Sequence, residues 1–543
     1  MLESMSSDRF HPHLNSLISQ ALEHVGINPI GLRPSITFAI LEGTRTHIDT
    51  WGLSNLNYNS PATDQTPFHL ASLAKQICAL VILIAENDGR LDLSDHLGRY
   101  IKRLPAVISA QKISDLLFHR GGVRDHWALA TALGWRAGDR IDTSDVMRLV
   151  QNERTLNFEP GARFLYSNTG YVLLAELAAH LYKTPFDTLA RQLVFAPANM
   201  PTASFHLSFG VPMLNRIVGY QLSSTDDQWT ERDPPYAVAG ATCLRASAND
   251  MMSFARALTS ENVFPKAVLS KFNSSAEELG YFPQPYGFGQ FILRDAASNG
   301  AYARHGGFDY GFNSVFLRHL RQPFAVFAAS AASEPEIEVA ADRVFRSLCG
   351  ELLPTHAVVP AHRASSLTTR PELRPGCYRS KLGDDVRVIE KVGDNRFRLK
   401  WMQGFDLRPS ATCWILDGTP WELRQAMDGT SITLENTVSG QQDQLDILPS
   451  QRSWEMPIDA LFLNREHQAI LRLTGGTSPN VKLSFAKGCE HTATAVSENL
   501  LVWDGGFWAE IYREAGEVVK LIVNHPRCLK VVFSRVSDVA GYQ

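Results

Sequence analysis

The chain has 543 residues, of which 44% are hydrophobic and 20% are charged. This composition indicates a folded globular protein rather than a disordered or fibrous one, and the length predicts two to four domains. A formal net charge of -4, without a clustered basic face, argues against a nucleic-acid or anionic-membrane partner.

The N-terminus and the cysteines bear on the compartment. Residues 1–9 are polar and acidic where a secretory signal needs an apolar run, and no window approaches the length of a membrane span. Seven cysteines are widely scattered without a Cys-x-x-Cys spacing: Cys78, Cys243, Cys349, Cys377, Cys413, Cys489 and Cys528. Reduced thiols in a cytoplasmic protein without a metal site are the simplest expectation.

The first part of the chain predicts strands near both ends and helices between them. A helix over 14–25 and strands over 35–41 and 46–51 come first, and most segments from 91 to about 200 have helical periodicity. Strands return over 286–292, 314–317 and 324–328, before a closing helix over 334–349. Strands from both ends predict one sheet covered by helices, hence a mixed α/β domain with an all-α part.

The composition changes after Gly350. A run without periodicity, 354–372, is expected to be a linker between a first domain (1–353) and the remaining chain. Short strands with turn signals every ~8–12 residues then predict antiparallel sandwiches or barrels. A break near 452–459 divides this part into two small β domains, 373–455 and 456–543.

Ser72 and Lys75 form the first candidate catalytic pair. Residues three apart on a helix are neighbours, so the serine has a base in reach. The apolar run 77–85 predicts a helix packed on all sides, in which burial would lower the lysine pKa. Ser-x-x-Lys also occurs at 109–112 and at 484–487, but the latter lies in a strand-like alternation that points the two side chains to opposite faces.

Two further motifs complete the set. Tyr166-Ser167-Asn168 precedes a helical run, and His305-Gly306-Gly307 lies just before an apolar strand. Ser-x-x-Lys, Tyr-x-Asn and His-Gly-Gly in this order resemble the penicillin-recognising serine hydrolases, the beta-lactamase-like proteins of peptidase family S12. Alone, Tyr-Ser-Asn would more often be a helix N-cap, and His305 a structural histidine.

Other stretches narrow the resemblance to the D-aminopeptidase branch. These are residues 116–129, the Phe-Glu-Pro-Gly stretch at 158–161, Tyr-Gly-Phe-Gly at 286–289, and the histidine of the third motif. That branch has a catalytic domain followed by two eight-stranded antiparallel barrels of the lipocalin-like type. The resemblance therefore implies this architecture over nearly the whole chain.

The resemblance also implies roles. Ser72 would attack a carbonyl carbon, while Lys75 and Tyr166 share the proton transfers. His305 would orient Tyr166 or contact substrate, in place of the lysine or arginine of many β-lactamases. The backbone N–H groups of Ser72 and Phe308 would hold the oxyanion. Asn168 would bind the substrate amide and position Lys75, and no cofactor is required.

Substrate-facing positions are expected elsewhere too. Gly306 and Gly307 would let substrate lie against the strand without interference from a Cβ atom. Trp127 is a candidate for the cleft wall, although an aromatic residue beside a helix is more often in the core. His119, in a second His-x-Gly, precedes Tyr166 and so breaks the motif order; a turn after a helix is expected there.

One departure from the branch concerns specificity. Related D-aminopeptidases send a loop of the last barrel into the active site to recognise the free amino group of the substrate. The corresponding stretch here, 500–509, predicts a tight hairpin, from which Asp504 would reach only a short way. A wider pocket that accepts amides, esters or blocked peptides is therefore an alternative.

The leading hypothesis is a serine hydrolase that forms an acyl-enzyme at Ser72 and releases N-terminal D-residues from small peptides or amides. The alternatives are an esterase or β-lactamase-like hydrolase, an acyl transferase, and a non-catalytic ligand-binding protein. The expected partner is a small peptide, amide or ester substrate. The oligomeric state is left open, a homodimer included.

Overall fold

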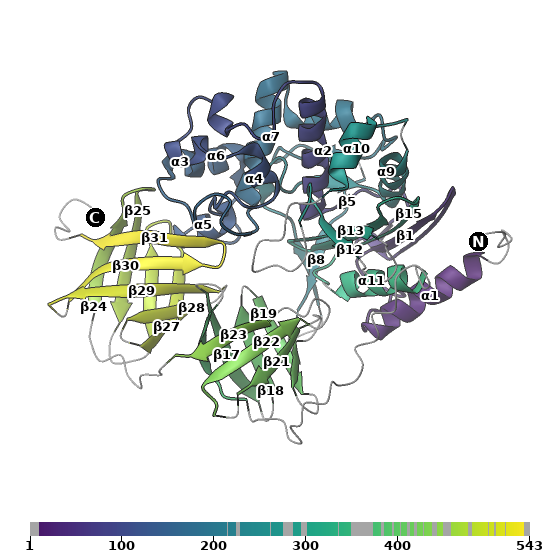
Figure 1. Ribbon diagram of the computed structural model, residues 1–543. Coiled ribbons are helices and arrows are strands. Elements are labelled where there is room, and N and C mark those ends of the chain that lie inside the picture. The colour runs from purple at the N-terminus through teal and green to yellow at the C-terminus, as the bar shows by residue number, and fades with distance from the viewer. Residues whose placement is uncertain are drawn as a thin grey trace.

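The computed structural model describes residues 10–536 with gaps. The residues left out within this range are 214, 224–227, 261, 275–285, 295–300, 335, 349–372, 382–384, 394–395, 402, 410–412, 417–420, 427, 437–441, 449–457, 476–479, 498, 504–505 and 516. The expected linker and the break between the two β domains lie largely outside the described residues. Figure 1 shows a mixed domain of helices and sheet, and two β-barrels that follow it in the chain.

A six-stranded antiparallel sheet organises the first domain, in the order β12-β13-β14-β15-β1-β2. Its strands are β1 (Ile36–Glu42), β2 (Arg45–Trp51), β12 (Phe291–Arg294), β13 (Ala301–Asp309), β14 (Phe312–His319) and β15 (Phe324–Ser330). Because β1 pairs with β15 along its whole length, the two ends of the domain meet in one sheet. The mixed α/β fold class predicted from the sequence is confirmed.

Helices cover both faces of this sheet, since successive side chains of a strand point to opposite sides. Phe38 and Ile40 pack on the face covered by α1 (Phe10–His24) and α11 (Glu336–Leu348). Ala39 and Leu41 point the other way, toward the core that contains α2 (Ala74–Asn87). Residues 74–85 of α2 are all buried, so this helix lies inside the domain, between the sheet and the remaining helices.

The remaining helices come after β2 and before β12 in the chain. They are α3 (Ala106–Ser109), α4 (Ile113–Leu117), α5 (His126–Ala132), α6 (Thr143–Asn152), α7 (Asn168–Tyr182), α8 (Phe186–Ala190), α9 (Ala248–Thr259) and α10 (Lys266–Phe272), with short turns η1 (Ala71–Leu73), η2 (Leu97–Arg99) and η3 (Arg191–Phe195). Within the described residues, no helix combines the length and apolarity needed to cross a membrane.

Short strands connect these parts. They are β3 (Leu53–Asn55), β4 (Ser60–Pro61), β5 (Phe68–His69), β6 (Ile141–Asp142), β7 (Ser204–Phe205), β8 (Gly219–Leu222), β9 (Trp229–Arg232), β10 (Tyr236–Ala237) and β11 (Leu244–Ala246). The three-stranded sheet β5-β11-β7 is important for the site, because β5 ends only two residues before η1.

Two closed eight-stranded barrels follow, as the resemblance implied. The first consists of β16 (Gly376–Ser380), β17 (Val386–Gly393), β18 (Arg396–Trp401), β19 (Gln403–Pro409), β20 (Trp414–Leu416), β21 (Trp421–Gln425), β22 (Ser431–Asn436) and β23 (Gln442–Ile447). The second consists of β24 (Ile458–Asn464), β25 (Ala469–Gly475), β26 (Asn480–Phe485), β27 (Glu490–Ser497), β28 (Leu500–Trp503), β29 (Phe507–Glu514), β30 (Glu517–His525) and β31 (Cys528–Arg535).

The strand predicted over 286–292 is wrong in most of its length. Only Phe291 and Ile292 belong to a strand, and Tyr286 makes an isolated bridge to Phe291. Gly289 has a φ of +74°, and a Cβ atom there would lie 2.4 Å from the Lys75 carbonyl oxygen. The glycine therefore allows the chain to turn back against the first turn of α2.

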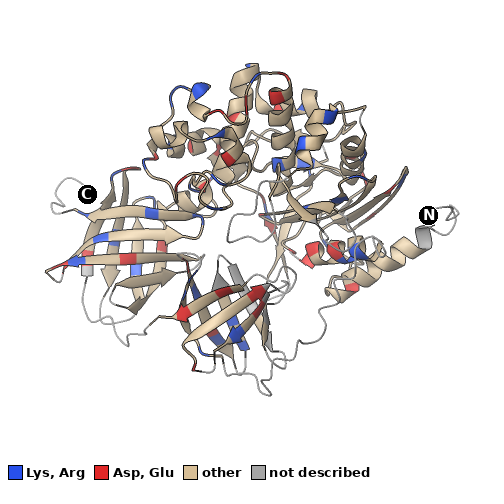
Figure 2. Ribbon diagram, in the orientation of Figure 1, with Lys and Arg blue, Asp and Glu red and all other residues tan. Residues whose placement is uncertain are grey.

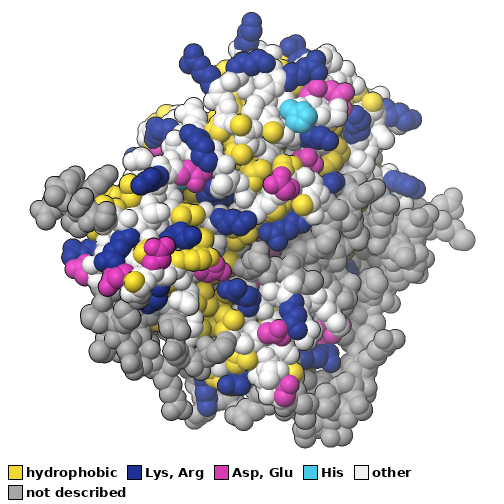
Figure 3. All heavy atoms as spheres, turned by 60° about the vertical axis from the view of Figure 1, so that its left-hand side comes forward, with side chains coloured by type: hydrophobic (Ala, Val, Ile, Leu, Met, Phe, Trp, Pro, Cys, Tyr) yellow, Lys and Arg dark blue, Asp and Glu magenta, His cyan; other side chains and the backbone are white. Residues whose placement is uncertain are grey.

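Charged side chains of both signs are mixed over the described part of the chain. Figure 2 shows basic and acidic positions interspersed along the helices and both barrels. Figure 3 shows the same mixture on the face that carries the second barrel, with hydrophobic groups between the charges. Six described cysteines, all but Cys349 of the seven, are buried free thiols.

Candidate active site

Ser72 and Lys75 lie side by side where the central helix begins. Ser72 belongs to the turn η1, whereas Lys75 lies in the first turn of α2. The Lys75 Nζ atom is 3.1 Å from the Ser72 Oγ atom. This distance suits a direct proton transfer between the two side chains.

Lys75 is fully buried. Besides Ser72, its Nζ atom contacts the Asn168 Oδ1 atom at 2.7 Å and the carbonyl oxygen of Ala241 at 2.8 Å. Burial lowers the pKa of Lys75 to about 7; the Asp125 charge opposes this shift and the Arg527 charge adds to it. A substantial fraction of the lysine is therefore neutral near pH 7 and able to accept the serine proton.

Asp125 and Asn168 fix the lysine. The backbone N–H and the Nδ2 atom of Asn168 both donate to the Asp125 Oδ2 atom at 2.8 Å, which leaves the amide oxygen facing Lys75. The other carboxylate oxygen caps helix α5. Burial alone would raise the pKa of Asp125, but the Arg527 charge and the bonds from Asn168 are among the effects that hold it at about 2.

Tyr166 completes this group. Its phenol hydrogen-bonds with Ser72, and the Lys75 Nζ atom lies 4.9 Å from its ring centroid. Burial raises the pKa of Tyr166 above its usual value of 10.0, despite the bond from Ser72. The phenol is thus protonated at rest, so Lys75 is the better initial base, and Tyr166 can relay a proton that Lys75 replaces.

His305 lies within β13, not before a strand as the sequence suggested. Its Nδ1 atom is 2.6 Å from the Gly306 carbonyl oxygen, which can only accept, and its Nε2 atom is 3.2 Å from the Tyr286 hydroxyl. Nδ1 therefore carries the proton and Nε2 accepts from Tyr286. Burial and the Lys75 charge lower the pKa of His305 to about 3, so the ring is neutral.

His305 hydrogen-bonds with the hydroxyl of Tyr286 rather than with that of Tyr166. The ring centroids of His305 and Tyr166 lie 6.2 Å apart. Sequence reasoning missed the residue that packs directly on Tyr166, which is His119. The two ring centroids are 4.3 Å apart, and the His119 Nδ1 atom accepts from the Ser167 N–H at 3.1 Å. His119 does follow helix α4, as expected, with a φ of +55°.

The two glycines of the third motif are needed for packing within the protein. A Cβ atom on Gly307 would lie 2.3 Å from the Leu70 carbonyl oxygen, and one on Gly306 would lie 2.6 Å from the Glu338 carboxylate. The space that was expected to admit substrate is thus occupied by the turn before Ser72 and by α11. Phe308 follows with its side chain 59% exposed.

The remaining predicted positions are more peripheral. Trp127, on α5, packs against Tyr236 with ring centroids 4.0 Å apart. Asp504 lies outside the described residues. The hairpin that contains it is short, because Trp503 pairs with Phe507.

A different connection of the second barrel reaches the site. The turn between β30 and β31 carries Arg527, whose Nη1 atom lies 3.9 Å from the Asp125 Oδ2 atom. The Arg527 carbonyl oxygen accepts from the Asp125 N–H at 3.0 Å. A cation from the C-terminal part of the chain therefore lies beside the catalytic group.

Glu153, Glu466 and His467 bring ligand atoms close enough for a metal ion. However, the Arg124 guanidinium lies 2.9 Å from the Glu153 carboxylate and 3.0 Å from that of Glu466. Both acids already have a cationic partner, so we regard this cluster as an ion-pair network between the first domain and the second barrel.

Comparison with known proteins identifies a matching family and a similar relative. The Beta-lactamase family model matches residues 15–348. A D-aminopeptidase of Brucella anthropi is 24% identical over 498 residues, which are 87% of this chain and 89% of the relative.

Solved structures share the fold. D-amino acid amidase from Ochrobactrum anthropi SV3, complexed with L-phenylalanine, is 20% identical with a TM-score of 0.51, over 62% of this chain and 99% of that one. A protein named SurE is 15% identical with a TM-score of 0.53, over 97% of this chain and 98% of its own. The latter similarity extends through both barrels.

Proposed function

The chain belongs to the beta-lactamase family and is a serine hydrolase, and we propose that it acts as a D-aminopeptidase or amidase, cleaving small amides or peptides whose acyl residue has the D-configuration. The observation that carries the proposal is the contact of Ser72 with a fully buried Lys75 whose pKa is lowered to about 7. Such a lysine can activate a serine at neutral pH without a histidine.

Acylation begins with proton transfer from Ser72 to neutral Lys75. The Oγ atom attacks the amide carbon, and the backbone N–H groups of Ser72 and Phe308 stabilise the negative oxygen that forms. The Tyr166 phenol then gives its proton to the leaving nitrogen and recovers one from Lys75. The C–N bond breaks, the free amine departs, and the acyl group remains on Ser72.

Deacylation uses the same groups in reverse. Water attacks the ester carbon while neutral Lys75 accepts its proton, and Lys75 then returns this proton to the Ser72 oxygen as the acid leaves, with the Tyr166 phenol as the relay. His305 remains neutral throughout and supports Tyr286. Asn168 keeps Lys75 in place through its amide oxygen.

A second candidate activity is the cleavage of blocked amides or esters. Two observations favour it: the β28–β29 hairpin is short, and the charge that the second barrel brings to the site is the cation of Arg527. A free ammonium group on the substrate would be repelled by this cation, whereas an acylated nitrogen would not.

Hydrolysis of D-alanine p-nitroanilide, its L-isomer and its N-acetylated form separates these possibilities. We expect the D-isomer to be cleaved faster than the L-isomer. Cleavage of the free D-amine alone would establish a D-aminopeptidase, and equal or faster cleavage of the acetylated form would establish the blocked-amide activity. Equal rates for the two isomers would refute the proposed stereochemistry.

Ser72→Ala is the control for all three substrates. It should abolish turnover while the far-UV circular dichroism spectrum and the unfolding temperature remain close to those of the parent. Turnover that survives in the folded variant would refute Ser72 as the nucleophile.

A further inference from the structure

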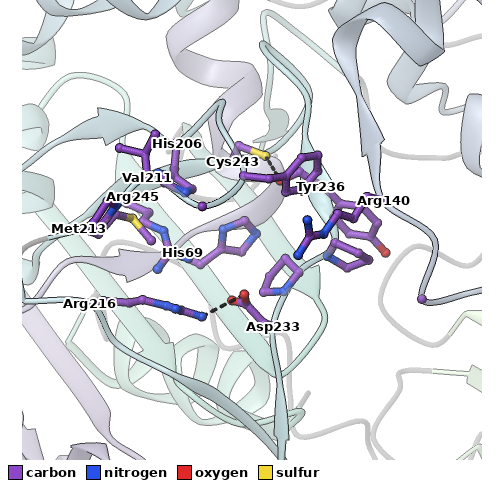
Figure 4. Close-up of a pocket in the computed structure, with 16 residues that line it drawn as sticks. His69, Arg140, His206, Val211, Met213, Arg216, Asp233, Tyr236, Cys243 and Arg245 are labelled. Atoms are coloured by element: carbon purple, nitrogen blue, oxygen red, sulfur yellow. Dashed lines mark hydrogen bonds and ion pairs between the residues drawn. The ribbon is translucent and has the colours of Figure 1, made fainter.

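A second cavity lies beside the strands that position Ser72. It has a volume of about 540 Å³, within the range of small-molecule sites, and Figure 4 shows its lining. Its floor includes His69 on β5, Cys243, and Arg245 on β11, all buried. Ser72, Lys75, Tyr166 and His305 do not line it.

Arg245 is the unusual residue of this floor. It is only 4% exposed, and its Nε and Nη1 atoms have no hydrogen-bond partner among the described residues. Its guanidinium carbon lies 5.8 Å from the Phe312 ring centroid, which supplies weak cation–π attraction. A buried guanidinium ordinarily has a carboxylate or several hydrogen-bond acceptors, because desolvating an unpaired charge is costly.

The rim adds more positive charge. Arg140 stacks on Phe209, 5.2 Å from its ring centroid, and has no acidic partner in the described part of the chain. Arg216 pairs with Asp233 at 2.8 Å, and Asp233 is the one acidic residue among the lining side chains that the structure describes. Three arginines therefore face one carboxylate in the described lining, which has an excess of positive charge, while Asp309 lies behind it and pairs with His69 at 3.1 Å.

The positive charge of the cavity also affects the pKa of His206. Burial lowers the pKa of His206, and the Arg245 and Arg216 charges lower it further. Burial likewise lowers the pKa of Arg245 to about 10, although Asp233 opposes the shift. An anion in the cavity would relieve this unfavourable field.

We infer that this cavity binds a small organic anion, whose carboxylate or phosphate group lies against Arg245 and Arg140. Arg245 and Arg140 both line the cavity, and a guanidinium pairs favourably with the negative oxygens of either group. Phe209, Val211 and Tyr236 offer apolar surface to the rest of the ligand. The site goes beyond the proposed function, since it needs no reaction at Ser72.

The cavity and the catalytic group share structural elements. His69 lies three residues before Ser72, and Cys243 lies two residues after Ala241, whose carbonyl oxygen contacts Lys75. Tyr236 lines the cavity and also packs on Trp127. A bound anion would therefore stabilise the strands that carry the catalytic serine.

The test is a calorimetric titration of the full chain with phenyl phosphate and, separately, benzoate, at an ionic strength fixed with sodium chloride. Saturable binding of one molecule per chain by either anion is expected, and the comparison shows which head group is preferred. Absence of saturable binding by both anions would overturn the inference.

Variants locate the site. Arg245→Gln and Arg140→Gln should each weaken binding, the former by about tenfold or more, because charge-assisted hydrogen bonds are lost. Asp233→Asn should strengthen it. Arg140 is exposed, so its variant keeps the test valid even if Arg245→Gln fails to fold.

Two control variants distinguish this cavity from the rest of the surface and from the active site. Arg136→Gln removes an exposed arginine that pairs with Asp139 outside the cavity, and it should leave the dissociation constant unchanged. Ser72→Ala should also bind the anion as the parent does. Equal affinity of the parent and of Arg140→Gln for the anion would contradict the inference. Loss of binding in Ser72→Ala would also contradict it, because it would place the anion in the active site.

Discussion

The Arg527 Nη1 atom lies 3.9 Å from the Asp125 Oδ2 atom, and this pair joins the second barrel to the catalytic group. Asp125 accepts two bonds from Asn168, which in turn contacts Lys75. The Arg527 charge lowers the pKa of both Asp125 and Lys75. The barrel thus contributes to the electrostatics of the active site.

Arg527→Gln should shift the acid limb of the pH–rate profile to higher pH. The reactive lysine is neutral, and removing a nearby positive charge makes its protonated form easier to retain, so the pKa of Lys75 rises. Activity at pH 6 should fall several-fold, whereas activity near pH 9 should approach that of the parent. The measurement is kcat/KM from pH 5 to 10.

Arg535→Gln is the matched control for this variant, because it removes a half-exposed arginine of the same barrel that pairs with Glu517. Its profile should coincide with that of the parent. A uniform loss of activity in Arg527→Gln, without a shift of the limb, would mean that the arginine only holds the two domains together.

The acid limb of the parent should lie near pH 7 and belong to Lys75 rather than to a histidine. The pKa of His305 is lowered to about 3, so this ring stays neutral over the whole range. His305→Gln retains an acceptor for the Tyr286 hydroxyl and should lower kcat without moving the limb. A limb that moves in this variant would assign the titration to His305.

Much of the catalytic group was predictable because its motifs are local. Ser72 and Lys75 are three residues apart, and so close a spacing in a helix places two side chains together. The order of the three motifs then predicted which distant segments meet. The central sheet was predictable as well, because its strands at both ends of the domain have clear apolar patterns.

The features that the sequence did not predict depend on contacts between segments that are far apart in the chain. Arg527 follows Asp125 by about 400 residues, and nothing in the β30–β31 turn marks it as a site residue. His119 was passed over because its motif breaks the family order, yet packing places its ring against Tyr166. The error at 286–292 arose because Gly289 turns a segment that otherwise has strand-like residues.

Lys75→Met should abolish acylation and raise the unfolding temperature at pH 7. The folded chain lowers the lysine pKa from 10.5 to about 7, so between these values the unfolded state binds more protons. The parent therefore gains stability as the pH rises from 7 to 10.5, and the advantage of the methionine variant should shrink over that interval. Thermal unfolding at pH 7, 8.5 and 10 measures this trend.

Lys271→Met is the comparison, because it removes a half-exposed lysine that pairs with Glu86. It should show no such pH dependence. If the unfolding temperature of Lys75→Met exceeded that of the parent by more as the pH rose, the assigned direction of the Lys75 pKa shift would be wrong.

Gly307→Ala should reduce kcat/KM by about 100-fold, because the oxyanion donors must keep their spacing. The added Cβ atom would lie 2.3 Å from the Leu70 carbonyl oxygen and 2.5 Å from the Ser314 Oγ atom. Strand β13 must then move away from the turn that holds Ser72. Gly138→Ala, where no atom lies within 4 Å, should retain activity. A fully active Gly307→Ala enzyme would show that this close contact is not required.

Glu153→Gln should weaken the attachment of the second barrel. The Arg124 guanidinium is fully buried and lies 2.9 Å from the Glu153 carboxylate, and His467 approaches the same carboxylate at 3.3 Å. Removing the charge leaves buried cationic and polar groups with poorer partners, which should cost about 2–4 kcal/mol of unfolding free energy. Urea unfolding followed by tryptophan fluorescence measures the change.

The surface variant Glu517→Gln provides the reference for that loss. Its carboxylate is 66% exposed and pairs with Arg535, so the effect should be below about 1 kcal/mol. The turn that carries Arg527 reaches Asp125 from the same barrel. If Glu153→Gln loosens the second barrel, the acid limb of kcat/KM should therefore also shift to higher pH, as is expected for Arg527→Gln. A destabilised variant with an unchanged limb would mean that the Arg527 contact persists independently of the Arg124 network.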